Sequence, residues 1–451
     1  TSATNSYNTA MGFQAGLSVT TGTTNTLIGG LSGDAITTAS SNTAVGYSSL
    51  GVNTTGAFNT AIGYASLDAN TTADNNTAVG YNSLGLNTTG TRNTGLGNNT
   101  LQANTTANNN TALGYNAMAL NTTGASNTAI GKDALDANTT ASNNVAVGYA
   151  SLEANTTGAS NVAVGANALD ANTTASNNTA VGYSALTANT TGDQNVAVGA
   201  NAGLSVTTGV QNTLIGYLAG DALTDADYNV ALGATALGAD TLGSRAVAIG
   251  RNALSAQNFT SATDNYNVAV GFSAGAAVTT GIQNTLIGGL AGDALTDADY
   301  NVAIGLSALG ADTLGSKTVA IGYGTLGSQN FTSATDTYNT GVGYNAGVAL
   351  TTGVNNTLIG GLAGDAITTG SSNAALGYNS LGLNTTGARN VAMGAESLSA
   401  NTTGADNVAI GEDALTANTT ASNNTAVGTD SLKANTTGTN NVAVGKDALD
   451  S

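Results

Sequence analysis

The chain of 451 residues carries a net charge of −18, has eight Lys and Arg residues, and contains no Pro, Cys, His or Trp. With 41% hydrophobic and 8% charged residues, it is too apolar for a disordered chain and too poor in charge for an ordinary globular domain. The scattered cations exclude a basic nucleic-acid surface, and no stretch approaches the ~18 apolar residues of a membrane-spanning helix. Without His or Cys, the Ser–His and Cys–His nucleophile systems are impossible, so we do not expect an enzyme.

After residues 1–7, a repeat begins at Asn8 and continues to the end of the chain. If Asn is position 1, the chain holds 26 units at a spacing of 17, except for two spacings of 21 that start at 246 and 318. Position 5 is Gly and position 4 is Val, Ile, Leu or Met in every unit, which indicates a strand that ends in a sharp bend. The period is too short for a pair of helices but suits one coil of a solenoid. We therefore predict an all-β fold, a single continuous parallel β-solenoid over residues 1–451.

The residue types at positions 9 and 12 of the repeat are correlated. Position 9 is Leu or Met in 18 units and Gly in eight; position 12 is apolar in those eight units and Asn, Asp or Gln elsewhere. Because a close-packed interior tolerates neither a void nor an extra side chain, positions 9 and 12 are interpreted as filling one interior volume. The eight pairs are Gly16/Val19, Gly33/Ile36, Gly203/Val206, Gly220/Leu223, Gly275/Val278, Gly292/Leu295, Gly347/Leu350 and Gly364/Ile367.

The two faces of the predicted strand lead to an expectation about oligomeric state. Positions 2 and 4 point to one face and position 3 to the other. Position 3 is Ala, Leu or Gly in all 26 units, whereas a solvent-facing column would be expected to contain Lys, Glu or Ser. We therefore expect both faces to be buried, one inside the coil and one against a parallel partner chain in a homotrimer. The Asn at position 1 either forms a side-chain amide ladder along the stack or only accommodates a turn.

The tripeptide Asn-Thr-Thr occurs 13 times between Asn53 and Asn435, and each copy is formally an N-glycosylation acceptor. The alternative is a simple turn in which the Asn is the polar partner of the core Leu at position 9. The candidate acceptors on the first six of these coils are Asn53, Asn70, Asn87, Asn104, Asn121 and Asn138.

A longer period of 72 appears in blocks 195–266 and 267–338, each made of three units of the regular length and one long unit. The shared segment "GDALTDADYN" carries enough carboxylates to hold Ca²⁺, although their spacing matches no EF-hand loop. The alternative is a solvated acidic turn and no cofactor. The candidate ligands are Asp221, Asp225, Asp227, Asp293, Asp297 and Asp299.

Each long unit adds a loop, at residues 255–264 and 327–336, that we expect to protrude from the regular coil. Exposed aromatic side chains on such loops are candidates for contact with a receptor or a glycan. The alternative is that the rings fold back and cover the bulge. The candidate residues are Phe259, Tyr266, Phe331 and Tyr338.

The repeat resembles a known family. "NVAVGANALDANTTASN" from Asn161 and "NVAIGEDALTANTTASN" from Asn407 are similar to the head repeats of YadA-type trimeric autotransporter adhesins, and also to repeats in bacteriophage tail-fibre shafts. The resemblance covers nearly the whole chain and implies a left-handed parallel β-roll that trimerises. The coiled-coil stalk and membrane-anchor barrel of those adhesins have no counterpart here, which favours the tail-fibre alternative.

We therefore expect a structural fibre that gives stiff reach and host or surface attachment, located outside the cell on a virion or a bacterial surface. Its expected partners are copies of itself and a cell-surface receptor or glycan, without nucleic acid or membrane insertion. The alternative is a self-assembling, glycosylated extracellular filament without a specific receptor. Because the chain starts within a block and ends within a repeat, we also expect it to be a segment of a longer fibre.

Overall fold

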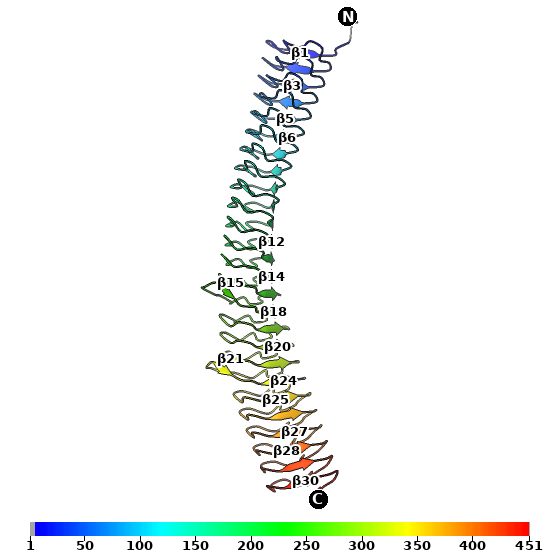
Figure 1. Ribbon diagram of the computed structural model, residues 1–451, viewed down its shortest axis with the longest axis vertical. Helices are drawn as coiled ribbons and strands as arrows, with labels where there is room; N and C mark the ends of the chain where they lie inside the picture. Colours follow the sequence, from blue (N-terminus) through cyan, green and yellow to red (C-terminus); the bar gives the residue numbers. More distant parts are fainter. Residues whose placement is uncertain (1–4, 451) are drawn as a thin grey trace. The chain divides into compact units, whose positions relative to one another are not determined.

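The computed structural model describes residues 5–450 and shows an all-β chain with no helix in that range. It is a parallel β-solenoid of about 26 turns with about 17 residues per coil, as the sequence predicted. The chain divides after Asp227 into two compact units. Within each unit the coils follow one another in sequence order, and every coil contributes one short strand to a continuous sheet (Figure 1).

Each regular coil forms a three-residue strand from positions 2 to 4. The strands of the first unit are β1 (Thr9–Met11), β2 (Thr26–Ile28), β3 (Thr43–Val45), β4 (Thr60–Ile62), β5 (Thr77–Val79), β6 (Thr94–Leu96), β7 (Thr111–Leu113), β8 (Thr128–Ile130), β9 (Val145–Val147), β10 (Val162–Val164), β11 (Thr179–Val181), β12 (Val196–Val198) and β13 (Thr213–Ile215). Neighbouring strands pair in parallel and without any offset, so that Thr43 lies beside Thr60 and Ala44 beside Ala61.

The second unit has the same kind of strands and two additional short pairs. Its regular strands are β14 (Val230–Leu232), β16 (Val247–Ile249), β18 (Val268–Val270), β19 (Thr285–Ile287), β20 (Val302–Ile304), β22 (Val319–Ile321), β24 (Thr340–Val342), β25 (Thr357–Ile359), β26 (Ala374–Leu376), β27 (Val391–Met393), β28 (Val408–Ile410), β29 (Thr425–Val427) and β30 (Val442–Val444). The additional strands are β15 (Gly243–Ser244), β17 (Thr263–Asp264), β21 (Gly315–Ser316) and β23 (Thr335–Asp336). β15 pairs with β17, and β21 pairs with β23.

The Gly at position 5 is required by both conformation and space. Its φ lies between 125° and 142° in every unit, a region that side chains rarely adopt. A Cβ on Gly63 would also collide with the carbonyl oxygen of Gly80 in the next coil. The bend after the strand therefore depends on glycine for two independent reasons, as its invariance within the chain predicted.

The exchange between positions 9 and 12 is confirmed. Leu50 is fully buried in a regular coil, whereas Gly33 leaves a space that Ile36 enters from position 12. A Cβ on Gly33 would lie 2.9 Å from Cδ1 of Ile36 and 2.7 Å from Cδ2 of Leu27, so position 3 fills the same volume. Interior side chains from three points of the coil therefore share one closely packed volume.

The strand faces alternate as predicted, and position 3 is the one that points into the coil. Ala44 and Ala61 are fully buried, and Leu27 is 1% exposed. Positions 2 and 4 point outward, where they form a surface that we call the outer face: the side chains at positions 2 and 4 of every coil. In this single chain the outer face is not covered, and Ile62 on it is 39% exposed.

Two columns of asparagine run inside the stack. At position 1, the Asn42 side-chain oxygen accepts a hydrogen bond from the backbone N–H of Asn59 in the next coil (2.9 Å), while its amide donates to the carbonyl of Gly56 in its own coil (3.0 Å). At position 12 the side-chain amides bond to one another, as where Asn70 Nδ2 donates to Asn53 Oδ1 at 2.9 Å. At position 1 the predicted amide-to-amide bond occurs in some coils, as from Asn42 Nδ2 to Asn25 Oδ1 at 3.2 Å, beside the side-chain-to-backbone bonds. The ladder at position 12 was not predicted.

Candidate functional site

The two long coils form the least regular part of the described chain. Directly before the first of them, the buried Asp240 takes position 12, where most coils have Asn. One of its carboxylate oxygens accepts from the backbone N–H groups of Gly243 and Phe259, both at 3.0 Å. The other accepts from Gln257 Nε2 at 2.6 Å, and Gln257 Oε1 accepts from Asn267 Nδ2 at 2.9 Å. This network ties the inserted loop to three successive coils.

The same network recurs in the next block. Asp312 accepts from the N–H groups of Gly315 (3.1 Å) and Phe331 (3.0 Å) and from Gln329 Nε2 (2.6 Å). Gln329 Oε1 accepts from Asn339 Nδ2 at 2.9 Å. We did not predict this role for Asp240 and Asp312, although a sequence signal exists: Asp in place of Asn at position 12, directly before each long coil.

Of the four aromatic side chains that the sequence suggested for receptor contact, two are buried and two are exposed. Phe259 is 6% exposed and Phe331 is 7% exposed, so their predicted availability to a receptor was wrong and the alternative, that the rings fold back, is correct. The backbone bond to the buried Asp holds each ring inward. Tyr266 and Tyr338 are 52% and 55% exposed and remain candidates for contact.

Tyr266 and Tyr338 each lie against a cation. The Arg245 guanidinium lies 5.2 Å from the Tyr228 ring centre and 5.8 Å from that of Tyr266, and it pairs with Asp264 on β17. In the second block, Lys317 lies 5.3 Å from the Tyr338 ring and pairs with Asp336. The hydrogen bond that Lys317 donates lowers the pKa of the Asp336 carboxyl and raises the pKa of Lys317 itself. An exposed aromatic ring therefore lies beside an ion pair directly after each loop, at Tyr266 and Tyr338.

The acidic segments do not assemble the predicted calcium site. Asp227 accepts from the N–H of Val210 (2.8 Å) and Asp299 from that of Ile282 (2.8 Å), each contacting the preceding coil. Asp225 accepts from Thr208 Oγ1 and Asp297 from Thr280 Oγ1. Desolvation raises the pKa of Asp221 and Asp293, and within residues 5–450 no three carboxylates gather as metal ligands. The solvated-turn alternative describes these segments better, because four of the six carboxylates already serve a contact between coils.

The Asn-Thr-Thr tripeptides are not open acceptors in the folded chain. Their Asn side chains lie at position 12 inside the stack, and the amide nitrogens already donate hydrogen bonds, for example Asn53 Nδ2 to the carbonyl of Gly56 at 2.9 Å. A glycosyl group on such a nitrogen would need space that the next coil occupies. Of the two alternatives, the turn therefore describes the folded chain at the six candidates, all with 0% exposure: Asn53, Asn70, Asn87, Asn104, Asn121 and Asn138.

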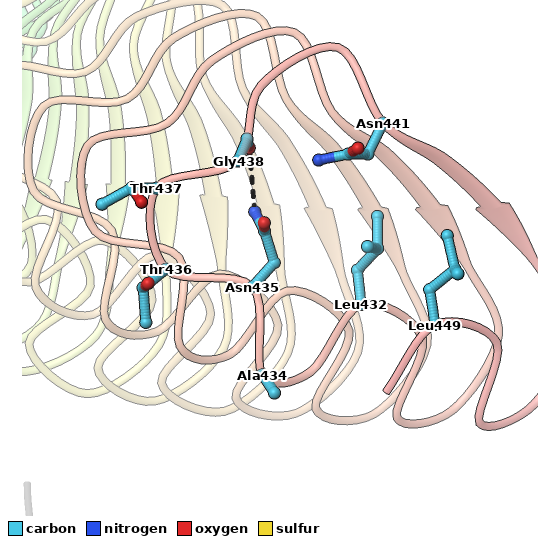
Figure 2. Close-up of a pocket in the computed structure, with 8 residues that line it drawn as sticks. All are labelled: Leu432, Ala434, Asn435, Thr436, Thr437, Gly438, Asn441 and Leu449. Carbon is cyan, nitrogen blue, oxygen red and sulfur yellow. Dashed lines mark hydrogen bonds between the residues drawn. The ribbon is translucent and has the colours of Figure 1, made fainter. Parts of the chain in front are cut away.

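The described surface has shallow hollows. One lies on the last coil and is lined by Leu432, Asn435, Asn441, Leu449 and their neighbours (Figure 2). There Asn435 Nδ2 donates to the Gly438 carbonyl at 3.0 Å, the same bond that position 12 makes in other coils. This hollow is therefore lined by the side chains that fill the interior in other coils, such as Leu432 at position 9 and Asn435 at position 12. A second hollow in the same unit lies beside Tyr323, over Gly310, Gly324 and Gly327.

The outer face is the largest feature that repeats. Position 4 is apolar in every coil, and exposed examples include Leu113 (44%), Leu376 (46%) and Met393 (40%). A side chain in such a column is already flanked by the coils on either side, so this exposure means that its outward side is open. The outer face thus joins an apolar column at position 4 to a column of mainly Thr or Val at position 2. An uncovered apolar column of this length is typical of an interaction site.

No protein-family model and no curated protein sequence matches this chain. In the described residues there is also no helix of sufficient length and apolarity to cross a bilayer.

Proposed function

We propose that this chain is the shaft of an extracellular structural fibre that self-associates through its outer face. The observation that carries the proposal is the apolar position 4, open to solvent in a single chain and unbroken over 26 units. A sheet face that remains exposed to solvent would be expected to include polar and charged side chains, as the solvated face of an antiparallel sheet does.

A second copy of the same chain is the partner that fits this face best. The outer faces of two copies share one period, so a contact made by one coil can be repeated by all the others. Large hydrophobic interfaces of this kind are typical of obligate homo-oligomers. A parallel homotrimer satisfies this requirement and agrees with the resemblance to adhesin heads and tail-fibre shafts, either of which would place the chain on a bacterial surface or on a virion.

The test is the native mass of the chain. The variant Ile130→Lys, Val147→Lys, Val164→Lys places three charges on the outer face, and we expect it to be monomeric where the unmodified chain is trimeric. Three threonines at the exposed position 14 of the same coils provide the matched control, which should stay trimeric: Thr140→Lys, Thr157→Lys and Thr174→Lys. A monomeric unmodified chain at micromolar concentration would overturn the proposal. A mass that grows with concentration without a fixed stoichiometry would instead favour the open-ended filament.

For attachment, we propose the surface beside the two inserted loops, where Tyr266 and Tyr338 are exposed next to ion pairs. Aromatic rings with low conformational entropy are common anchors in recognition sites. Replacing both rings, Tyr266→Ala with Tyr338→Ala, should reduce binding to bacterial cells at least tenfold. The control is Tyr149→Ala with Tyr183→Ala, which removes two equally exposed rings. Equal binding by both double variants would exclude this surface as the contact.

A further inference from the structure

Position 6, directly after the invariant Gly, carries stacked tyrosines in two places. In the first unit the rings of Tyr47, Tyr64 and Tyr81 form a three-ring column, with centroids 5.6 and 5.3 Å apart and interplanar angles of 13° and 9°. In the second unit Tyr323 and Tyr344 stack at 5.4 Å and 10°. We did not predict this column, because position 6 varies along the chain and carries Tyr in only some of the coils.

The stacking is fixed by the backbone on both sides of each ring. Gly63 N–H donates to the Val45 carbonyl at 2.8 Å, and Ala65 N–H donates to the Tyr47 carbonyl at 3.0 Å. These two bonds hold the Cα atoms of Tyr47 and Tyr64 one coil apart, so the rings are neighbours in every molecule. Preorganised neighbours react with effective concentrations far above those of free groups.

The stacked rings are also accessible. The five side chains are between 51% and 59% exposed, so a reagent in solution reaches their phenol groups. The chain has no cysteine and no tryptophan, so its three methionines are the other side chains that compete with tyrosine for oxidising equivalents. Exposed phenols in fixed pairs are the arrangement that oxidative coupling needs.

We infer that the two tyrosine columns are sites of oxidative cross-linking between successive coils, by hydrogen peroxide with a haem peroxidase. The enzyme takes one electron and one proton from each of two phenols, which become phenoxyl radicals. A bond forms between one ortho carbon of each ring, and each ortho hydrogen then moves to the phenol oxygen of its own ring. Two tyrosines and one hydrogen peroxide thus give one dityrosine and two waters.

The cross-link would close short covalent loops across the coil-to-coil contact. It joins residues 17 apart at Tyr47–Tyr64 and Tyr64–Tyr81, and 21 apart at Tyr323–Tyr344. Such links reduce the conformational freedom of the unfolded chain. They also keep successive coils joined when a mechanical force acts along the chain. The role suits a fibre but does not depend on the proposed function, because it rests on the ring geometry of a single chain.

The chain contains its own controls. Tyr115, Tyr149 and Tyr183 occupy position 6 with exposures of 48%, 53% and 58%, but the coils beside them carry Asn98, Lys132, Ala166 and Ala200 at that position. These tyrosines match the stacked ones in accessibility and have no tyrosine in the adjacent coils; Tyr149 also has Lys132 Nζ at 5.2 Å from its ring centre. A difference between the two sets therefore reports stacking and not exposure.

The experiment oxidises the full chain at low micromolar concentration with peroxidase and hydrogen peroxide. Dityrosine fluorescence is followed, and the linked peptides are mapped by mass spectrometry. We expect links at Tyr47–Tyr64, Tyr64–Tyr81 and Tyr323–Tyr344, and a higher melting temperature after the reaction.

Two double variants decide whether stacking is the cause. The variant Tyr64→Phe, Tyr344→Phe keeps the ring stacks but removes one phenol from every pair, so the fluorescence should fall at least fivefold. The control Tyr149→Phe, Tyr183→Phe removes two isolated phenols and should leave the fluorescence nearly unchanged. Links spread over the isolated tyrosines, or equal losses in both variants, would overturn the inference.

Discussion

At the scale of single residues, the buried amide or carboxylate at position 12 determines which hydrogen bonds a coil makes with the next one. The column at position 12 runs without interruption from Asn53 to Asn189, where the next coil has Val206 and the side-chain oxygen of Asn189 is buried without a hydrogen-bond partner. Asp240, like these asparagines, accepts a bond from the position-12 amide of the next coil, here Gln257. It differs at its other atom: where Asn53 has an NH₂ that donates to the carbonyl of Gly56, Asp240 has an oxygen that accepts from the N–H groups of Gly243 and Phe259.

The variant Asp240→Asn tests this distinction. In one orientation the new NH₂ group would face Gln257 Nε2, and Gln257 cannot flip without losing its bond from Asn267. In the other orientation the NH₂ would face the N–H groups of Gly243 and Phe259, which are also donors. A buried unsatisfied donor costs about 1–3 kcal/mol, so we expect the loop to open more often and the amide of Phe259 to exchange its hydrogen faster by the corresponding factor. Hydrogen exchange measured by mass spectrometry checks this.

The matched control is Glu412→Gln, which removes one negative charge at an exposed site of the same unit. It should change stability by less than about 0.5 kcal/mol. Asp312→Asn should reproduce the effect in the second block, and the double variant should be additive because the two sites lie a whole block apart and share no partner. Unchanged protection of Phe259 in Asp240→Asn would show that the carboxylate does not hold the loop.

At the scale of the coil, features that recur in every unit could be predicted from the sequence, whereas the direction of the strand faces could not. The bend at Gly63 and the shared volume of Gly33 and Ile36 could be predicted, since 26 units in one chain compare the same site many times. The direction of the strand faces could not, because neither face of the three-residue strand carries a charged side chain that would mark it as the solvent side. The structure shows that position 3, as in Ala44, is the buried one.

The features that the sequence left open share a physical cause. Asn53 was a candidate glycan acceptor because a local tripeptide does not reveal that its side chain belongs to the ladder with Asn70. Whether Phe259 is exposed or folds back stayed open, because the bond that turns it inward comes from Asp240, in the preceding coil. Both outcomes depend on contacts between coils, which a reading of one coil at a time does not contain.

At the scale of the whole molecule, the chain is a series of nearly equivalent coils whose contacts are with their immediate neighbours. In such repeat proteins stability is close to a sum of repeat terms and neighbour terms. The repeat length should therefore matter more than the number of repeats. A deletion that keeps the register should be tolerated, and one that breaks it should not.

We expect deletion of one complete coil, residues 144–160, to leave the fold of the first unit intact. It would bring Asn138 against Asn172, Leu135 against Leu169 and Ile130 against Val164, so each interior or outer column continues with a residue of the same kind. The melting temperature, followed by circular dichroism, should shift by only a few degrees, as for a change of about 1 kcal/mol.

Deletion of residues 144–151, about half a coil, is the control for this prediction. It removes β9 and its Gly bend but leaves Leu152 and Asn155 without a complete coil around them. That variant should melt much earlier and be cleaved by proteases near the junction, because the interior side chains of the residual half coil have no partners to pack against. Equal damage from the two deletions would show that the coils do not act as interchangeable units.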